Sequence, residues 1–585
     1  MRRSCDILLV FPPAFYPHMP YLGLAAVSAA LRKGEKGHRK VDLNVMLYDH
    51  LLRESVVEGA WRKVRMLADK GRVTEDYRRR TELTGHPAMS AVIRMLPTAK
   101  AAVRSRLSGI SPSIDPWRVL TLGLDIVSDA HFPEQITFTK YEPAVSSKSS
   151  RRIADYLPCR HSSLYHGPSF AVLRDRISAE KPGIVGFSIT ASDQIVPAAG
   201  LSASLKEEFP EIKVLWGGSV VTRLASVFAR PNALSGIYDA VVLGEGDHDI
   251  CETVDQVRAS ELSSVSGQPI VFQAKPSSCR LDRLAAPDFD DLPLDLYFDK
   301  ELVLPLLASR RCYWGKCLFC DIPASYAPTH REREPSLVVD DMELLARRYG
   351  ARQIKFADDA VSPAMLRGIS AELLRRSLDL RWEAYVRLEP EFADVDFCDM
   401  LFAAGCRWLY FGLESASIPT LSKMQKGNTP ALSSRILRTA SAAGLKTHVW
   451  VVVGFPSETR DDVERTIDFV LEHGPFLHSI EVNQFALSRL APAMTDGVIR
   501  ELGITPHVNP EQDLALLYDY DVTEGLSQEE AHALTLEVRE IFRREIGVPN
   551  VVRSSHLSEQ DDKDPGVVAR THTELPDLAS ARTGV

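Results

Sequence analysis

The sequence predicts an α/β protein with two parallel sheets in series. These are an N-terminal doubly wound sheet and a partial barrel of six β/α units, followed by a small C-terminal helical region. Short apolar strands alternate with helical stretches over about the first 250 residues, and the alternation starts again near residue 302. A segment rich in Asp, Pro and Leu, residues 279–300, separates the two runs. Six β/α units fit into residues 301–486, whereas a complete eight-fold barrel needs about 250 residues.

The first run, residues 1–278, begins with an apolar strand over 7–11 that ends at Pro12 and Pro13. Residues 51–165 are charged, helical and irregular in pattern, so we interpret them as an insertion into this domain. The remaining elements that we expect are a helix over 20–33, a strand over 41–49, a strand over 184–190, a helix over 195–208, and strands over 212–216 and 239–243.

The second run supplies the strands of the predicted partial barrel and is followed by residues 487–551, which we expect to be helical. Ser527 and Glu530 form the sequence signature of a capping box, which predicts a helix from there to about residue 546. Residues 552–585 are polar with few large apolar side chains, so we expect a disordered tail. The strands expected after the first one, near 302, are 353–357, 380–387, 407–412, 447–453 and 478–485.

Composition excludes several classes of protein. The hydrophobic fraction is 45% and the charged fraction 25%, as in folded domains. The formal net charge of −9 argues against nucleic acid as a partner, because phosphate contacts need clustered cations. No apolar run approaches the ~18 residues of a membrane span, and the first residues do not resemble a secretory signal. Nine cysteines, an odd number and mostly scattered, indicate a reducing compartment, so we expect a cytoplasmic protein without membrane partners.

One cysteine cluster is the strongest chemical signal. Cys312, Cys317 and Cys320 follow a predicted strand with the spacing Cys-x-x-x-x-Cys-x-x-Cys. Three thiolates on one loop can hold a soft metal centre, and on a four-iron cluster they leave one iron open to a substrate. A structural zinc usually takes four protein ligands, and the nearest further candidate is His330. The spacing favours an iron–sulfur cluster over an incomplete zinc site or buried free cysteines.

This loop and the strands after it resemble the radical S-adenosylmethionine (SAM) superfamily, whose loop has the pattern Cys-x-x-x-Cys-x-aromatic-Cys after the first barrel strand. The present loop has one additional residue between its first two cysteines, and Phe319 occupies the aromatic position. The resemblance implies a 4Fe–4S cluster on the three cysteines and SAM as cofactor. It also implies SAM contacts at later strand ends, by Asp358, Asp359, Arg387, Gly412, Glu414, Ser415 and Gly454.

The N-terminal run resembles the Rossmann-like cobalamin-binding domain that precedes the barrel in one large radical SAM subfamily. A plain doubly wound domain with glycine turns is the alternative for this run alone. The motif Asp-x-His-x-x-Gly that places a histidine on cobalt is absent around His18 and His131, so we expect neither to bind cobalt. The resemblance implies cobalamin contacts at Ser188, Thr190, Gly217, Gly218, Ser219, Gly244, Glu245 and Gly246.

Together these resemblances imply a cobalamin-dependent radical SAM enzyme, most simply a C-methyltransferase that acts on an unactivated carbon of a peptide or specialised small metabolite. An electron donor such as flavodoxin or ferredoxin is implied as a partner. Three alternatives remain open: a cobalamin-dependent cyclase or ring-rearranging enzyme, an enzyme whose N-terminal domain is a substrate platform without cobalamin, and a non-catalytic iron–sulfur scaffold or redox sensor. No residue identifies a general acid or base.

Overall fold

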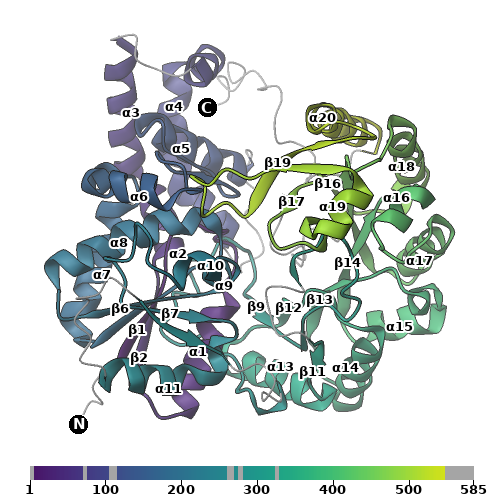
Figure 1. Cartoon of the computed structure of the whole chain (residues 1–585), viewed down its shortest axis with the longest axis horizontal. Helices are drawn as coiled ribbons and strands as arrows, with labels where there is room; N and C mark the ends of the chain where they lie inside the picture. Colours follow the sequence, from purple (N-terminus) through teal and green to yellow (C-terminus); the bar gives the residue numbers. More distant parts are fainter. Residues whose placement is uncertain are drawn as a thin grey trace, which may run out of the picture.

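A computed structural model describes residues 5–69, 75–104, 115–259, 269–274, 281–322 and 329–546, with only the backbone described for residue 69 and residues 75–88. The predicted fold class is confirmed, because two six-stranded parallel sheets follow one another along the chain (Figure 1). The expected disordered tail over 552–585 lies outside the described residues.

The N-terminal sheet has the strand order β2-β1-β5-β6-β7-β8, with all neighbours parallel. Every residue of β1 is buried, as expected for a strand covered by helices on both faces. The strands are β1 (Ile7–Phe11), β2 (His38–Asp42), β5 (Ile184–Ser188), β6 (Lys213–Gly217), β7 (Ala240–Leu243) and β8 (Ile270–Gln273). The helices around them are α1 (Leu22–Lys33), α2 (Leu43–Leu51), α7 (His166–Glu180), η2 (Ser192–Gln194), α8 (Ile195–Glu208), α9 (Ser219–Arg223), α10 (Ala225–Phe228) and α11 (Gly246–Ala259).

The expected strand over 41–49 is wrong. Strand β2 ends at Asp42, whose side chain accepts a hydrogen bond from the Val45 backbone amide at 2.9 Å and caps α2. A short polar residue directly before an apolar run is a helix start signal, and here it outweighs the β-propensity of the run.

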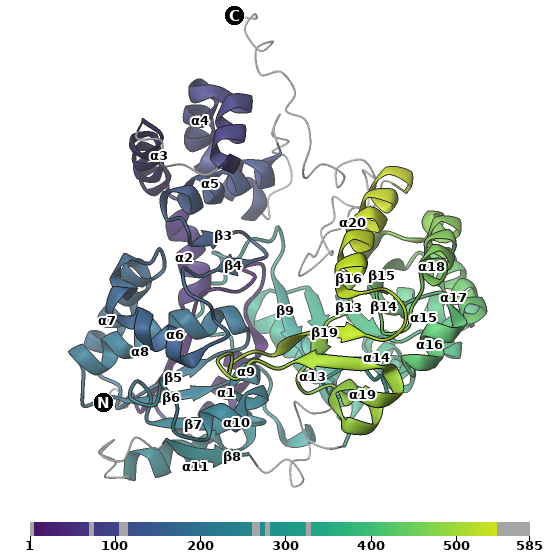
Figure 2. The same cartoon turned by 45° about the horizontal axis from the view of Figure 1, so that its top comes forward.

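The insertion forms helices and a short hairpin, and its side chains Trp61, Leu96 and Leu124 belong to a core that also includes Tyr48 of α2 and Phe298. Figure 2 shows α3, α4 and α5 projecting beyond the N-terminal sheet. Its elements are α3 (Glu54–Asp69), α4 (Glu75–Arg104), α5 (Pro116–Ala130), β3 (Gln135–Ile136), β4 (Tyr141–Glu142), α6 (Ser150–Tyr156) and η1 (Leu157–Ser162).

The second sheet is the partial barrel, with six parallel strands in the order β9-β12-β13-β14-β15-β16. The strands are β9 (Val303–Leu306), β12 (Gln353–Phe356), β13 (Arg381–Val386), β14 (Cys406–Glu414), β15 (Lys446–Val453) and β16 (Ser479–Gln484). The remaining elements of this region are η4 (Leu281–Arg283), β10 (Ser309–Arg310), β11 (Arg331–Glu332), α13 (Pro335–Tyr349), α14 (Pro363–Arg376), η5 (Pro390–Ala393), α15 (Val395–Ala403), α16 (Ile418–Lys423), α17 (Pro430–Ala442), α18 (Arg460–His473) and η6 (Gly474–Phe476).

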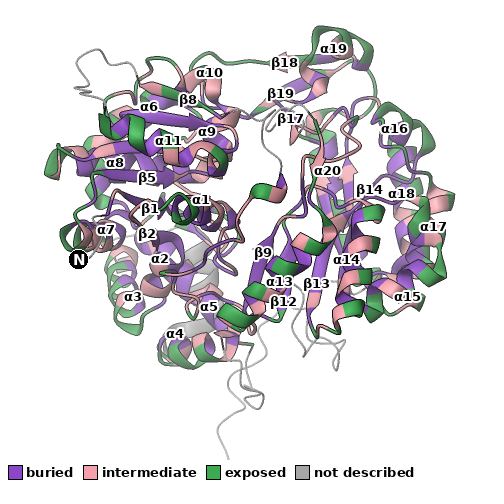
Figure 3. Cartoon of the chain, turned by 90° about the horizontal axis from the view of Figure 1, so that it is seen from below, coloured by how far each residue is buried: buried purple, intermediate pink, exposed green. Residues whose placement is uncertain are grey.

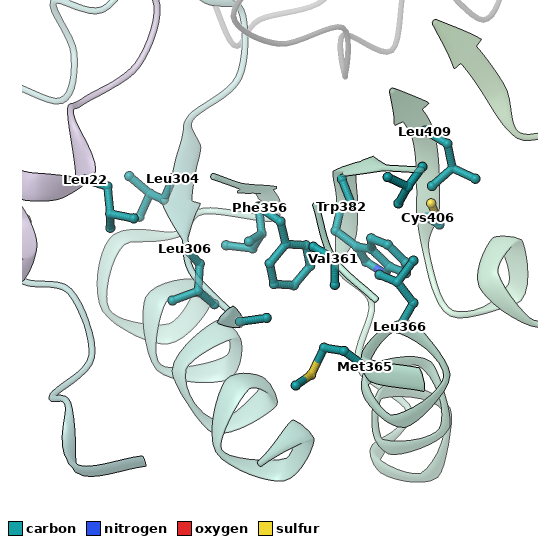
Figure 4. Close-up of a cluster of buried hydrophobic side chains, with 14 of the residues drawn as sticks. Leu22, Leu304, Leu306, Phe356, Val361, Met365, Leu366, Trp382, Cys406 and Leu409 are labelled. Carbon is teal, nitrogen blue, oxygen red and sulfur yellow. The ribbon is translucent and has the colours of Figure 1, made fainter. Parts of the chain in front are cut away.

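One hydrophobic core joins the two sheets. Leu22 of α1 belongs to the same buried cluster as Leu304 and Leu306 of β9 and Trp382 of β13, which Figure 4 shows in close-up. The strands of the barrel are mostly buried and the outer faces of its helices exposed, as Figure 3 shows. This shared core fixes the strand ends of the first sheet against the first strand of the barrel.

The segment after the barrel is not wholly helical, in contrast to the expectation for 487–551. A three-stranded antiparallel sheet lies there, in the order β17-β19-β18. Its strands alternate buried and exposed positions only weakly, so the strand signal in the sequence is small. The elements are β17 (Leu487–Ser488), η7 (Pro492–Met494), α19 (Asp496–Leu502), β18 (Ile504–His507), β19 (Leu517–Val522) and α20 (Gln528–Glu545), the last with the expected capping box at Ser527. Among the described residues, no helix is long and apolar enough to cross a membrane.

Candidate active site

A cavity of about 400 Å³ lies at the carboxyl ends of the N-terminal strands, facing the barrel. Its wall from the barrel side includes Arg310, Arg311 and Asp359, which come from the segments after β9 and β12. Ligands of open α/β sheets bind at this edge of the sheet. All eight residues predicted for cobalamin line this cavity: Ser188, Thr190, Gly217, Gly218, Ser219, Gly244, Glu245 and Gly246.

The two glycines at the end of β6 have different roles in the wall of the cavity. Gly218 has a φ of +108°, and a Cβ atom there would lie 2.3 Å from the Ile189 carbonyl oxygen. The backbone itself therefore requires a glycine at this position. A Cβ atom on Gly217 would contact Val242 at an ordinary 3.5 Å, so the backbone tolerates a side chain at this position.

Neither histidine considered in the sequence lines this cavity. His18 is buried, with its Nδ1 atom 3.0 Å from the Phe298 carbonyl oxygen. The Nδ1 atom of His131 lies 2.8 Å from the Val127 carbonyl oxygen at the end of α5. Both rings are thus engaged by backbone carbonyls away from the cavity.

Buried ion pairs attach the segment before Cys312 to the loop after β7. Arg310 donates to Glu245 at 2.6 Å and also pairs with Asp247, while Arg331 pairs with Glu245. The side chains of Glu245 and Asp247 are only 3% and 7% exposed. At the other end of the cysteine loop, Asp321 pairs with Arg223. Both ends of the loop are therefore held against the N-terminal domain.

The three thiols lie on a loop that other segments hold in shape. Cys317 is buried and the other two are half-buried. The Trp314 indole donates to the Gln425 carbonyl oxygen at 2.8 Å, and the Leu318 amide donates to that of Met424 at 3.1 Å. These bonds fix the loop against the segment after α16.

The charges around these thiols suit a cluster. Burial raises the pKa of Cys320 to about 12 and also raises that of Cys317. Lys426 and then Arg387 act in the opposite direction on Cys317, as needed to bind it as a thiolate. Within the described ranges, no three His, Cys, Asp or Glu side chains converge closely enough for one metal ion. Each thiolate of a four-iron cluster binds a different iron atom. The sulfur atoms of a cluster site therefore lie farther apart than those that bind one metal ion.

The two neighbouring aspartates after β12 have separate environments. Asp358 accepts hydrogen bonds from the Ala308 amide at 3.1 Å and from both the amide and hydroxyl of Ser309, at 2.5 Å and 2.6 Å. Its carboxylate therefore shapes the turn after β9. Asp359 instead lines the cavity, and burial together with the charges of Asp358 and Asp321 raises its pKa to about 7. Asp359 is thus the carboxylate available to a ligand.

A second set of buried, charged side chains lies near Cys317 at the ends of β13 and β14. Lys426 pairs with Glu414 at 2.7 Å, and Arg387 donates to Glu389 at 2.9 Å and to the Lys426 carbonyl oxygen at 2.5 Å. A Cβ atom on Gly412 would lie 2.5 Å from both Glu414 Oε1 and Lys426 Nζ, so a side chain there would displace this pair. Lys426 was missed in the sequence, since it lies in a loop without a recognisable motif.

Three other predicted residues lie around this group. Phe319 is half-buried, with its ring centroid 5.9 Å from Lys426 Nζ. The Ser415 hydroxyl is buried 3.1 Å from that of Thr466. A Cβ atom on Gly454 would lie 2.3 Å from the Ala531 Cβ, so packing against α20 requires this glycine. The Gly454 amide donates to Glu458, whose pKa burial raises to about 8.

Residues 306–470 match the family model of the radical SAM superfamily. Residues 306–470 are therefore a radical SAM domain. The resemblance inferred from the cysteine loop is thereby confirmed, and a domain of this family implies a 4Fe–4S cluster and SAM. The chain is 30% identical over 314 residues to an uncharacterized methyltransferase of Pyrococcus horikoshii, a match that spans 52% of this chain and 66% of the relative.

Two solved structures share the arrangement of domains. The radical SAM methyltransferase TsrM of Kitasatospora setae, solved with tryptophan substrate and a SAM analogue, is 16% identical, with a TM-score of 0.52 over 86% of this chain and 79% of that chain. The cobalamin-dependent radical enzyme OxsB, solved with aqua-cobalamin and SAM, is 13% identical, with a TM-score of 0.56 over 92% of this chain and 66% of that chain. At these identities the likeness concerns the fold.

Proposed function

We propose that the protein is a cobalamin-dependent radical SAM C-methyltransferase that acts on an unactivated carbon of a small metabolite or peptide. One observation carries the proposal. The cavity at the N-terminal strand ends is lined both by all eight residues expected to contact cobalamin and by residues that flank the cysteine loop. Cobalamin in that cavity and a cluster on the loop would therefore face one reaction space.

In this proposal residues 1–278 bind cobalamin, and residues 301–486 bind the cluster and SAM. Cys312, Cys317 and Cys320 hold the cluster, and Asp359 accepts hydrogen bonds from the SAM ammonium group. Arg387 offers its guanidinium to the SAM carboxylate. When bound, the cluster supplies an electron to SAM and cobalamin carries the methyl group, so the chain's own role is to position the reactants and exclude water.

The names of similar proteins support the same reaction class. The Pyrococcus relative and TsrM are both called methyltransferases, and OxsB is called cobalamin-dependent. TsrM takes tryptophan, which favours a small molecule as substrate here. An external reductant of the flavodoxin or ferredoxin type would supply the electron.

Cofactor content after anaerobic reconstitution tests the proposal. We expect wild-type protein to retain corrinoid, and Gly217→Leu to retain much less, because the new side chain extends into the cavity. Gly236→Leu is the matched control, since a Cβ atom there meets nothing within 4 Å. Equal corrinoid content in both variants, or none in the wild type, would refute cobalamin binding in this cavity.

A further inference from the structure

The concave face of the barrel sheet is unusual. In complete barrels this face is filled by branched apolar side chains. Here Leu409 and Val449 point to the hydrophobic core, and the residues that alternate with them are polar or aromatic. Several of these are half-buried, so the face is partly open to solvent. The side chains on it are Lys355, Glu383, Tyr385, Trp408, Tyr410, His448, Trp450, Glu481 and Asn483.

The aromatic members form a continuous wall. The Tyr385 ring stacks on Trp450 with centroids 5.5 Å apart, and Tyr410 stacks on Trp450 at 5.9 Å. Lys355 Nζ lies 4.6 Å from the Tyr410 ring centroid and 3.0 Å from Glu383, so a carboxylate already balances its charge. Lys355 is therefore committed to an internal pair.

Glu481 differs from Glu383 in this respect. Its carboxylate accepts hydrogen bonds from the Trp450 indole at 3.1 Å and from the Asn483 side chain at 2.9 Å, both neutral donors. Among the residues that the structure describes, no basic side chain lies within ion-pair distance of Glu481. A half-buried carboxylate without a counter-ion is a costly arrangement, which a cationic ligand would relieve.

The N-terminal domain contributes to the same place. Burial raises the pKa of the Tyr16 phenol, and the charges of Glu481 and then Asp193 raise it further. Tyr16 follows β1 and Asp193 lies in η2, so three distant segments of the chain come together. Burial raises the pKa of Asp193, and the positive charge of Lys140 lowers it. This region therefore combines aromatic rings with two carboxylates.

Strand register places the group beside the proposed SAM site. Gly412 of β14 pairs with Trp450 of β15, and Trp450 pairs with Glu481 of β16. The Glu414–Lys426 pair lies against Gly412 on this same face. Glu481 is therefore two strands across from Gly412, which the family resemblance assigns to SAM.

We propose that Glu481, together with the rings of Trp450 and Tyr385, binds an ammonium or guanidinium group of the methyl-accepting substrate. Carboxylates and the faces of aromatic rings both attract organic cations, and Trp is the most favourable ring. The assignment of this ligand as the substrate rests on the proposed function.

Probe binding to the reconstituted full-length protein tests this inference without any turnover. Benzylammonium and neutral benzyl alcohol have nearly the same shape, so their affinities, measured by calorimetry, report recognition of the charge. We expect the wild type to bind benzylammonium at least ten-fold more tightly than benzyl alcohol. Glu481→Gln should remove this preference and leave benzyl alcohol binding unchanged, whereas Glu481→Asp should retain a preference. Glu472→Gln, which changes a carboxylate that is 66% exposed on α18, is the matched control.

A wild type without a preference, or a preference that survives Glu481→Gln, would overturn the inference. Loss of benzyl alcohol binding in Glu481→Gln would point to a damaged fold, and the Glu481→Asp result then decides: a preference kept supports the inference and a preference lost overturns it. Failure of the proposed function is seen separately, as an absence of corrinoid or of methylated product from a protein that still prefers benzylammonium.

Discussion

The contact between Arg310 and the loop after β7 predicts a strong coupling of the two domains. Arg310→Met removes the cation that pairs with Asp247 and one of the two that pair with Glu245, and both carboxylates are almost completely buried. Breaking a buried pair from one side costs about 3–5 kcal/mol. Because this contact borders a cavity that water can enter, we expect the lower value, about 3 kcal/mol, which corresponds to about 100-fold in an equilibrium constant.

Native-state hydrogen exchange measures this effect where it arises. In Arg310→Met the amides of residues 244–247 and 309–311 should exchange about 100-fold faster, while those of β14 should not change. Arg352→Met is the control, because its pair with Asp379 is 75% and 89% exposed and such pairs stabilise little. Unchanged exchange in both loops would refute the idea that these ion pairs hold the cysteine loop against the N-terminal domain.

Three further predictions concern the cluster and two carboxyl groups. Replacement of Cys312, Cys317 or Cys320 by Ala should remove most of the iron, whereas Cys398→Ala, a buried thiol in α15, should retain it; iron and sulfide analysis decides this. Since the pKa of Glu458 is raised to about 8, the folded state keeps a proton that the unfolded state releases, and stability should fall as pH rises from about 5 to 8. Glu458→Gln should flatten this slope in urea titrations, and a parallel slope would contradict the assignment. Asp359, with a pKa near 7, should bind the SAM ammonium group more tightly at pH 8 than at pH 6, and Asp359→Asn should lose this dependence in equilibrium binding. Equal pH dependence in the two proteins would exclude Asp359 as the ammonium ligand.

Much of the fold was predictable because its signals are local. The strand–helix alternation predicted all six barrel strands to within a few residues, and Ser527 with Glu530 predicted α20. The prediction of the second strand was wrong because Asp42 caps a helix at the start of the apolar run, and this single cap decides between helix and strand. Strands β17–β19 were missed because they are short and stabilised by pairing between distant segments.

The candidate site was predictable only where a motif marks it. Asp358 and Asp359 are adjacent in sequence, yet one shapes a turn and the other faces the cavity, and only the folded chain distinguishes them. The same holds for Lys426, which reaches Glu414 through a loop without a motif, and for Glu481, whose neighbours come from β15 and from the N-terminal domain. Contacts between segments far apart in the chain leave no characteristic residue spacing in the sequence, so they cannot be predicted from it.

The by-products of SAM during turnover test the proposed methyl transfer most directly. With a substrate that becomes methylated, one SAM molecule should leave S-adenosylhomocysteine and another should leave 5′-deoxyadenosine, and the product should gain the mass of one methylene group. Mass spectrometry under anaerobic reducing conditions should therefore find the two by-products in about equal amounts, and Arg387→Ala should lower both together. 5′-Deoxyadenosine alone, with a product of unchanged mass, would contradict methyl transfer and indicate a rearrangement instead.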